Sequence, residues 1–416
     1  MIDFTIPPHI LENIDKYKTI AIEVMRPVAR QLDEGEHDRP HDYFNAMWPI
    51  VKKQYAGRID AIKNGTDNAT PDGPNWSLLE NILMIEWLSW GDAGQYLGRP
   101  TPSLGGAAID SVGTDEQKMR FYERWTQDPP KWGSMAITEP GAGSDNSSMR
   151  TTAVLDEETN EWILNGEKVF ITNGKLALDE SHGLSVVWAT IDPSAGRAGI
   201  KSFVVEGGNP GVSIAKQEHK LGIRASDTVS LSFQDCRIPY ENLLGSADIA
   251  SKKTGNKGFK GAMKTFNASR PSVAAGAIGV ARAAVELTQE VLAAEGIVVD
   301  YRKPKHELTA VERDLIEMEA RYRGAKHLVM KSVAMMVYGD NNRLEASQCK
   351  YRAGEAVTWI TQKAVDLLGP LGYSRELLAE KFMRDAKIND IYEGTRQINL
   401  LIIARSVLSY SRRELA

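Results

Sequence analysis

The chain has 416 residues, of which 42% are hydrophobic and 25% are charged, and its formal net charge is −5. A chain of this length is expected to bury two or three hydrophobic cores, and its weak negative charge excludes a general attraction to nucleic acid or to anionic membranes. No apolar run reaches the roughly 18 residues of a membrane-spanning helix, and the N-terminus lacks the pattern of a secretory signal. We therefore expect a cytoplasmic protein that binds neither nucleic acid nor membrane.

Cysteine and histidine usage argues against a disulfide framework and against a metal centre. The two cysteines, Cys236 and Cys349, are far apart and form no CxxC pair. This usage is typical of a reducing compartment. The seven histidines show neither HxxxH nor HExxH spacing, so we predict no metal site.

The first third of the chain, residues 9–130, carries apolar residues at the three-to-four spacing of amphipathic helices. Thr114 and Gln117 have the spacing of a capping box, which predicts a helix start. The polar segment 63–74 has no periodicity and predicts an exposed loop. We predict an N-terminal helical domain over residues 1–132.

From about residue 133 the pattern changes to short runs rich in β-branched and aromatic residues, separated by turn formers. The eight runs are SMAIT, TTAVL, EWILNG, KVFIT, LSVVWATI, IKSFVVE, VSIAK and VSLSF. They predict a central β domain over residues 133–240, a sandwich or barrel of antiparallel strands. Asn165-Gly166 and Asn173-Gly174 are predicted to form turns, the second of them in a hairpin.

After Pro239 the helical pattern returns, and a C-terminal domain is predicted over residues 241–416. Helices are predicted to begin at Ser269-Arg270-Pro271, at a capping box of Thr309 and Glu312, and after Glu393, and one more to end at Gly369-Pro370. Four long helices with one apolar face each predict a bundle, and thus an α+β fold that is mostly α. The size of this domain favours subunit association.

Two segments suit the binding of a ligand with a ring and phosphates. Thr138–Asp145 follows a predicted strand, and its Gly141 and Gly143 allow backbone amides to face a pyrophosphate or a planar heterocycle. The alternative is an ordinary tight turn. The segment is neither GxGxxG nor a Walker loop, so it does not indicate a dinucleotide fold. Phe170 and Thr172 alternate to one face of a strand, where they would stack on and hydrogen-bond to a ring system.

The segment Tyr392–Thr395 places a carboxylate, Glu393, beside a glycine at a loop-to-helix junction. Gly394 leaves room for another molecule to approach closely. The helix that follows has apolar residues at helical spacing, namely Ile398, Leu401, Ile402 and Val407. The alternative interpretation is an exposed glutamate stabilised by the helix dipole.

With the Thr138–Asp145, Thr172–Gly174, Arg270-Pro271 and Arg384–Thr395 segments in this order, the chain resembles the acyl-CoA dehydrogenase family from about residue 9 to residue 410. The resemblance implies an N-terminal helical domain, a central β domain and a C-terminal four-helix bundle, with non-covalent FAD between the last two. It further implies an acyl-CoA substrate, its α,β-dehydrogenation to a trans-2-enoyl product, and an electron-transfer flavoprotein as electron acceptor.

The resemblance also assigns roles to single residues. Glu393 matches the base that removes the α-proton while flavin N5 accepts the β-hydride, and Ser269, at the base position of the isovaleryl-type branch, cannot serve. The implied cofactor contacts are Met135, Ile137, Thr138, Gly143, Ser144, Phe170, Thr172, Arg302, Thr395 and Gln397. The implied substrate contacts are Ser144, Asn267, Arg270, Tyr392 and Gly394. Phe170 replaces a tryptophan of many relatives, and Asn267 replaces the usual aspartate partner of Arg270.

The chain departs from the family pattern in the half of the FAD site that relatives receive from a neighbouring subunit. The usual Arg-x-x-Phe-Gly becomes residues 302–306, RKPKH, and the usual Gln-Ile-Leu-Gly-Gly becomes residues 366–370, DLLGP. An aspartate repels a pyrophosphate, and Pro370 lacks an N–H donor. Two assemblies therefore stay open: a homotetramer or homodimer that uses Arg302, Lys303 and Lys305, and an α2β2 heterotetramer with a related chain.

Other functions on the same fold also stay open. They are an enzyme for acyl groups on a carrier protein, an enzyme that runs in the reducing direction, and a non-catalytic subunit that binds an acyl thioester. The presence of Glu393 argues against the last of these and against flavin monooxygenases, which do not need it. The length and branching of the acyl chain are not determined by the sequence.

Overall fold

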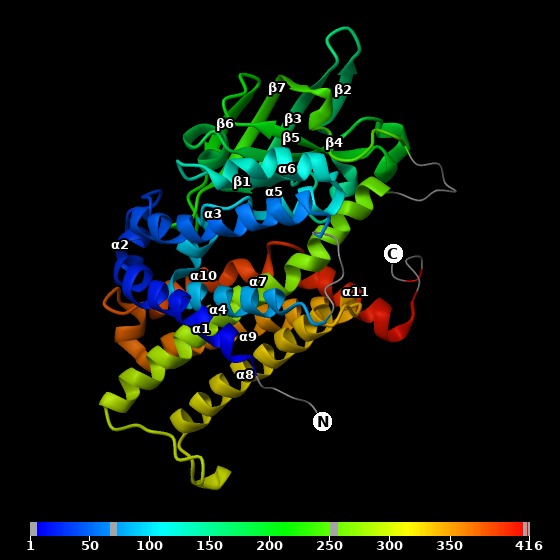
Figure 1. Ribbon diagram of the computed structural model, residues 1–416. Coiled ribbons are helices and arrows are strands. Elements are labelled where there is room, and N and C mark those ends of the chain that lie inside the picture. The colour runs from blue at the N-terminus through cyan, green and yellow to red at the C-terminus, as the bar shows by residue number, and fades with distance from the viewer. Residues whose placement is uncertain (1–5, 67–72, 250–256, 411–413, 415–416) are drawn as a thin grey trace.

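The computed structural model describes residues 6–66, 73–249, 257–410 and 414, with the side chains of 257–268 outside that description. One sheet lies at one end of the molecule and most of the helices at the other, while α3, α5 and α6 lie close to the sheet (Figure 1). The N-terminal helices are α1 (Pro8–Thr19), α2 (Ala29–Glu34), α3 (His41–Lys63), α4 (Trp76–Leu97), α5 (Ser103–Val112) and α6 (Asp115–Tyr122).

These helices confirm most of the N-terminal predictions. Thr114 caps α6 as predicted, because its Oγ1 accepts from the Gln117 N–H while the Gln117 side chain accepts from the Thr114 N–H. Between α1 and α2 the chain forms a π-helical turn, Ile20–Met25, and a 3-10 turn, Arg26–Val28. The predicted loop 63–74 begins where α3 ends, and its residues 67–72 lie outside the description.

Within the residues that the structure describes, the sheet contains seven strands, six of them in the order β1-β4-β2-β3-β7-β6 and the seventh, β5, paired to β4. Their bounds are β1 Gly133–Ala136, β2 Thr152–Asp156, β3 Glu161–Thr172, β4 Leu184–Thr190, β5 Ile200–Glu206, β6 Val212–Gln217 and β7 Thr228–Pro239. The expectation of purely antiparallel pairing was wrong, because β1 and β4 pair in parallel, as do β2 and β4 at one residue pair.

The predicted turn at Asn165-Gly166 was also wrong, as was the hairpin predicted at Asn173-Gly174, although Asn173 itself lies in a turn (φ 59). Asn165-Gly166 lies inside β3, which unites two of the predicted runs, and Gly166 (φ +148) marks a register shift against β7. A bulge needs the same permissive backbone as a turn, so the two patterns look alike in sequence. Asn173-Gly174 leads from β3 into a π-helical turn, Leu176–Glu180, instead of a hairpin.

The C-terminal helices are α7 (Lys257–Ala294), α8 (Ala310–Val337), α9 (Arg343–Tyr373), α10 (Ala379–Ala386) and α11 (Arg396–Leu408). The Thr309 capping box of α8 is confirmed. The prediction that the first of these helices begins at Ser269 was wrong, since α7 begins at Lys257 and contains Pro271. The predicted stop at Gly369-Pro370 is a kink, where Gly369 (φ 54) leaves helical geometry before the last turn of α9.

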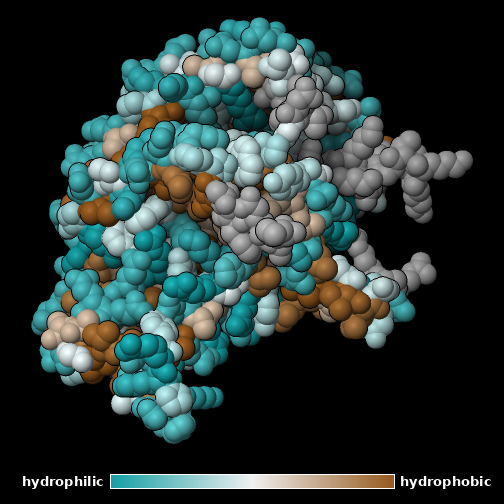
Figure 2. Space-filling model, turned by 60° about the horizontal axis from the view of Figure 1, so that its bottom comes forward, coloured by the Kyte–Doolittle hydropathy of each residue, from teal (hydrophilic) through white to brown (hydrophobic). Residues whose placement is uncertain are grey.

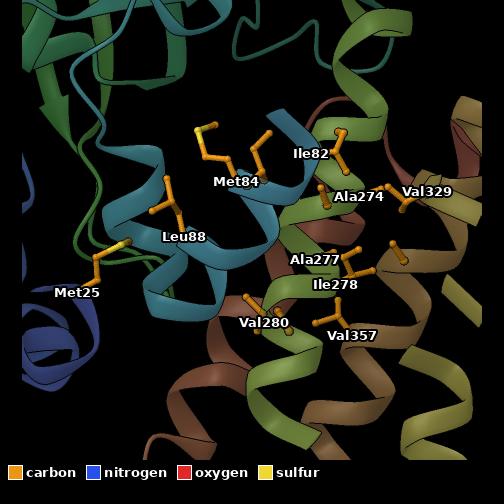
Figure 3. Close-up of a cluster of buried hydrophobic side chains, with 14 of the residues drawn as sticks. Met25, Ile82, Met84, Leu88, Ala274, Ala277, Ile278, Val280, Val329 and Val357 are labelled. Carbon is orange, nitrogen blue, oxygen red and sulfur yellow. The ribbon is translucent and has the colours of Figure 1, made fainter. Parts of the chain in front are cut away.

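Two hydrophobic cores hold these layers together. In the larger core Ala274 and Ile278 of α7 lie beside Val329 of α8 and Val357 of α9 (Figure 3). The smaller core packs α3, α5 and α6 against β4 and β5. Alternate residues of β4 enter the two cores, so this strand is buried on both faces. The β4 strand therefore contributes to both cores.

The last helix does not bury the apolar face that its sequence pattern suggests. Only Asn399 of α11 is buried, whereas Leu401 and Val407 are 39% and 62% exposed. Figure 2 shows hydrophobic side chains gathered on the side of the molecule where α11 lies. None of the helices in the described part of the chain combines the length and apolar character that crossing a lipid bilayer requires.

The contact of α4 with α7 predicts an effect of one methyl group on stability. A Cβ at Gly279 would collide with the carbonyl oxygen of Glu86 and lie 2.9 Å from Ser89 Cβ. We expect Gly279→Ala to lower the free energy of unfolding by about 1–3 kcal/mol, as measured by chemical denaturation. Gly324→Ala in α8 is the control, because nothing lies within 4 Å of its added methyl group. Equal loss in both variants would contradict this account of the packing.

Candidate active site

One large cavity, of about 1630 Å³, lies where the sheet meets the C-terminal helices. Its walls come from the end of β1 and the following turn, the end of β3, residues 218–223, α7, and the stretch from Arg384 to α11. Pockets for single small ligands usually measure about 300–1,000 Å³. This cavity is thus large enough for two ligands side by side.

Most of the site residues predicted from the sequence meet in this cavity. Those that line it are Met135, Ile137, Thr138, Gly143, Ser144, Phe170, Thr172, Arg270, Tyr392, Glu393, Gly394 and Thr395. Gln397 is exposed on α11 and is not part of the lining. The Arg302 side chain is 91% exposed and paired with Asp300, away from the cavity of its own chain. The side chain of Asn267 lies outside the described residues.

The glycine-rich segment after β1 is both a tight turn and part of the cavity wall. Glu139 and Ala142 exchange backbone hydrogen bonds at 3.2 and 3.1 Å, which closes the turn. The Val169 N–H donates to the Thr138 oxygen at 2.9 Å and ties the segment to β3. No atom lies within 4 Å of a Cβ added at Gly141 or Gly143, so the turn faces open space. A flat ligand can therefore approach its backbone.

A buried ion pair supports this turn from behind. The Lys168 ammonium lies 2.8 Å from Glu139 Oε1, and both side chains are almost fully buried. Glu139 also accepts hydrogen bonds from the N–H groups of Arg150 and Thr151 and from the Thr151 hydroxyl. Burial opposes ionisation of Glu139, but Lys168 and these donors hold its pKa below the ordinary value. The turn is thus anchored to β2 and β3.

Glu393 reaches the cavity through an unusual backbone. Its φ is 52° and that of Gly394 is 98°, so two successive residues are left-handed. A non-glycine residue in this region costs roughly 1 kcal/mol or more, and such strain is commonly found at functional sites. Thr395 caps α11, and the Asn399 amide donates to the backbone oxygens of Gly394 and Thr395 at 2.9 and 3.0 Å. These bonds hold the strained backbone in place.

The environment of Glu393 raises the pKa of its carboxyl group. Burial is the largest cause, and a hydrogen bond from Ser269 and the charges of Lys350 and Arg270 oppose it. Its Oε2 is buried and accepts no hydrogen bond from the described residues. Ser269, which the sequence excludes as a base, thus lies beside the base candidate as a hydrogen-bond donor. The alternative of an exposed glutamate is wrong for this side chain.

The cavity is cationic although the whole chain is acidic. Among the described residues, its wall has five arginines and two lysines against two glutamates: Arg197, Arg270, Arg343, Arg384, Arg405, Lys220, Lys387, Glu218 and Glu393. Arg270 is only 3% exposed, and its guanidinium donates to the Ser347 hydroxyl at 3.4 Å. This excess of positive charge suits ligands that carry phosphates.

The wall from Arg384 to Glu393 is attached to the rest of the molecule by a second buried ion cluster. The Lys381 ammonium lies 2.7 Å from Asp92 of α4 and 2.6 Å from Asp385. Burial opposes the charge of Lys381, but the two carboxylates outweigh it and raise its pKa. Asp385 also accepts from the Ile223 N–H at the connection between β6 and β7. Lys381 and Asp385 together therefore join α10 to α4 and to the β6–β7 connection.

Sequence reasoning missed three residues around Glu393, namely Ser269 as a donor, Lys350 and Asn399. Only Asn399 left a signal in the sequence, as a polar residue inside the apolar run of α11. The positions of Ser269 and Lys350 relative to Glu393 depend on how α7 and α9 pack, which no local pattern specifies.

The residues that line the cavity have the features that binding of a flavin requires. Phe170 is 66% exposed within the cavity wall, and Thr172 lines the same wall on the same strand. Beside them lie the open glycine turn and the cationic lining. An exposed aromatic ring, open backbone and positive charge are what a planar ring with a pyrophosphate requires.

Comparisons with known proteins show the family of the chain. Residues 134–236 match the acyl-CoA dehydrogenase middle domain, and residues 256–408 match the acyl-CoA dehydrogenase C-terminal domain. The chain therefore belongs to the acyl-CoA dehydrogenase family, whose members are FAD-dependent oxidoreductases. The fold implied by the resemblance is confirmed, with a curled mixed sheet at the centre of a mostly helical protein.

Individual relatives cover nearly the whole chain. An acryloyl-CoA reductase (NADH) of Anaerotignum propionicum is 38% identical over 390 residues, 92% of this chain and 90% of that protein. A mitochondrial short-chain specific acyl-CoA dehydrogenase of Rattus norvegicus is 38% identical over 393 residues, 92% of this chain and 86% of that protein. The solved structure of butyryl-CoA dehydrogenase from Megasphaera elsdenii has a TM-score of 0.81 and 30% identity, and the match covers 98% of this chain and 100% of that chain.

The cluster around Lys381 predicts a large stability effect. Lys381→Met leaves two carboxylates buried together, so we expect the free energy of unfolding to fall by about 3–5 kcal/mol. Lys331→Met is the control, because the ion pair of Lys331 with Glu345 is largely exposed on the lysine side and is worth about 0–1 kcal/mol. Denaturation curves of both variants measure the difference. A Lys381→Met protein as stable as the control would contradict the anchoring role.

Proposed function

We propose that this chain oxidises an acyl-CoA thioester to the trans-2-enoyl-CoA, with FAD as cofactor and Glu393 as base. The observation that carries the proposal is the carboxylate of Glu393, which lines the cavity, has a raised pKa, and has a buried Oε2 that accepts no hydrogen bond from the described residues. A desolvated carboxylate with one oxygen left without a hydrogen bond is well suited to remove a weakly acidic proton.

The cofactor side of the cavity is assigned to the β domain and the start of α11. The residues proposed to hold FAD there are Met135, Ile137, Thr138, Gly143, Ser144, Phe170, Thr172 and Thr395. When bound, FAD supplies the acceptor for the β-hydride at N5 of its ring. The turn at Gly143 and Ser144 presents polar groups, and Phe170 offers an aromatic face.

On the substrate side, Glu393 takes the α-proton. The electrons of the broken α-C–H bond form the new C=C bond, and the β-hydrogen leaves with its own electron pair. The backbone N–H of Glu393 is proposed as a donor to the thioester oxygen, which acidifies the α-carbon. Arg270, Tyr392 and Gly394 line the same wall and are proposed to place the thioester.

The electron acceptor and the direction of the reaction form part of the proposal. We expect an electron-transfer flavoprotein to receive the electrons, by resemblance to the family. A second candidate is reduction of an enoyl-CoA, which the 38% identity with an acryloyl-CoA reductase (NADH) favours. In that direction a protonated Glu393 would return the α-proton. Acryloyl-CoA with NADH, assayed beside saturated acyl-CoAs, separates the two directions. Carrier-protein substrates are a further arm of the same assay.

Replacement of the base tests the mechanism directly. We expect Glu393→Gln to keep its flavin but to lose about 100- to 10,000-fold in kcat, because a neutral amide accepts no proton. The measurement is anaerobic bleaching of the flavin absorbance by a panel of saturated acyl-CoAs beginning with butyryl-CoA. Glu317→Gln, on the surface of α8 and paired with Arg321, is the matched control. Bleaching of Glu393→Gln at the wild-type rate would refute the role of Glu393.

The assembly is proposed to be a homotetramer in which each chain completes its neighbour's FAD site. Two observations support this: the exposed apolar side chains of α11, and the α7–α8 connection, which lies at the end of the molecule away from the sheet (Figure 1) and contains the exposed Arg302. The DLLGP stretch does not favour it, because Asp366 is 68% exposed and negatively charged. Because of this stretch, an α2β2 heterotetramer is kept as the alternative assembly.

The assembly predicts the behaviour of the chain when it is purified alone. We expect a yellow tetramer with one FAD per chain, measured by native mass and visible absorbance. Arg302→Ala should keep the mass and lose FAD on dialysis, since its contact is proposed to cross the interface. Arg323→Ala, exposed on α8, is the control and should keep FAD. A colourless wild-type chain would instead indicate a second, complementary polypeptide.

A further inference from the structure

Lys350 of α9 is a buried cation that the reaction proposed above does not use. It is 2% exposed. Its ammonium donates to the backbone oxygen of Asn389 at 2.5 Å and lies 5.7 Å from the ring centroid of Tyr392. Both residues belong to the segment that leads into Glu393. A buried ammonium is costly unless nearby groups compensate it, so this position requires an explanation.

The surrounding face of α9 is shaped to receive that segment. Lys350, Gly354 and Thr358 are spaced by four residues and thus lie on one side of the helix. A Cβ at Gly354 would lie 3.0 Å from the oxygen of Asn389 and 3.2 Å from Asp390 Oδ1. The Thr358 hydroxyl lies 3.4 Å from Asp390 Oδ2. Close approach at Gly354 therefore brings the segment within reach of the lysine.

The segment from Ala386 to Tyr392 is held together by its own hydrogen bonds. The Tyr392 hydroxyl donates to the side-chain oxygen of Asn389 at 3.2 Å, and the Asn389 amide donates to Ala386 at 3.1 Å. The backbone N–H groups of Ile391 and Tyr392 donate to the oxygen of Ile388. Lys350 is thus bonded to a compact turn that ends at Glu393.

We propose that Lys350 is a positioning residue for the base: its ammonium holds the Asn389–Tyr392 turn against α9 and supplies the positive charge that favours the ionised form of Glu393. The inference rests on the role proposed for Glu393. It assigns to α9 an electrostatic function in addition to packing.

The charged and titratable groups around the pair come from four elements. Around Lys350 and Glu393 they are Tyr96 of α4, Arg270 of α7, Arg343 and Cys349 of α9, and Asp390 and Tyr392 of the turn. Burial raises the pKa of Glu393 most, and of the two cations that oppose it Lys350 acts more strongly than Arg270. The Arg270 guanidinium also donates a hydrogen bond to the Ser347 hydroxyl. Lys350 is therefore the cation to remove.

The lysine carries its charge under the conditions of the reaction. Burial lowers the pKa of Lys350 to about 8, although the carboxylates of Glu393 and Asp390 act in the opposite direction. The ammonium form consequently dominates at neutral pH. Above its own pKa the wild-type lysine becomes neutral, so its influence on Glu393 ends there.

The test is the pH dependence of kcat/KM for acyl-CoA oxidation by the FAD-loaded enzyme. Activity is lost as pH falls through the pKa of Glu393, because the protonated carboxyl group cannot accept the α-proton. Lys350→Met removes the charge, so we expect the acid limb of this variant to lie about one pH unit above that of the wild type. Below the limb, its kcat/KM should be about tenfold lower than that of the wild type. Above pH 8, where the wild-type lysine is itself neutral, the two profiles should converge. Lys350→Arg should keep the wild-type limb.

Lys363→Met is the matched control, because it makes the same change in the same helix where Lys363 pairs with Asp314 at 3.3 Å. We expect its pH profile to equal that of the wild type. If Lys350→Met does not fold, Lys350→Gln is used in its place, because it removes the charge but keeps an N–H donor near Asn389. We expect the same upward shift of the acid limb for this variant. A loss of kcat at every pH with an unmoved limb, or no change at all, would overturn the proposal.

Failure of the proposed function would look different. In that case Glu393→Gln itself retains activity and shows the wild-type acid limb. If instead Glu393→Gln is inactive and the limb of the Lys350 variants is unmoved, only the positioning role of Lys350 is wrong. An infrared band of the protonated carboxyl, taken as wild type minus Glu393→Gln, follows the same pKa without turnover.

Discussion

The structure depends on one buried cation, Lys381, and on its two carboxylate partners. Asp92 lies at the break in α4, Asp385 lies in α10, and the Ile223 N–H adds a bond from the sheet. Removing one charge from such a cluster leaves the others buried without compensation, so the parts are strongly coupled. Because α10 leads directly to Glu393, this cluster also sets the position of the candidate base relative to the sheet.

The pKa of Glu393, the candidate base, reflects a balance between burial and nearby charge in the same cavity wall. Full desolvation raises the pKa of a carboxyl group until it stays protonated and useless as a base. Cations and donors nearby limit that rise, and here Ser269, Lys350 and Arg270 act in this way. The strained backbone at Glu393 is held by the cap at Thr395 and by Asn399. The site is therefore built by three helices and one turn acting together.

Local sequence patterns anticipated much of the fold, and their failures share a physical cause. The capping boxes at Thr114 and Thr309 are contained within single helix turns, and both were predicted correctly. Asn165-Gly166 was misassigned because its glycine is needed for a bulge that only the pairing with β7 reveals. The start of α7 was misplaced because a proline suggests a helix beginning, whereas α7 begins at Lys257 and contains Pro271 in its interior.

The sequence by itself determined the family, the order of helical and β segments, and Glu393 as the candidate base, because these rest on short motifs and local periodicity. Only the tertiary structure decided that Phe170, Arg270 and Glu393 face one cavity. It alone also placed Lys350 beside the base and left α11 with apolar side chains exposed. Contacts between distant segments depend on how helices and sheet pack, and neither the spacing nor the composition of a single segment contains that information.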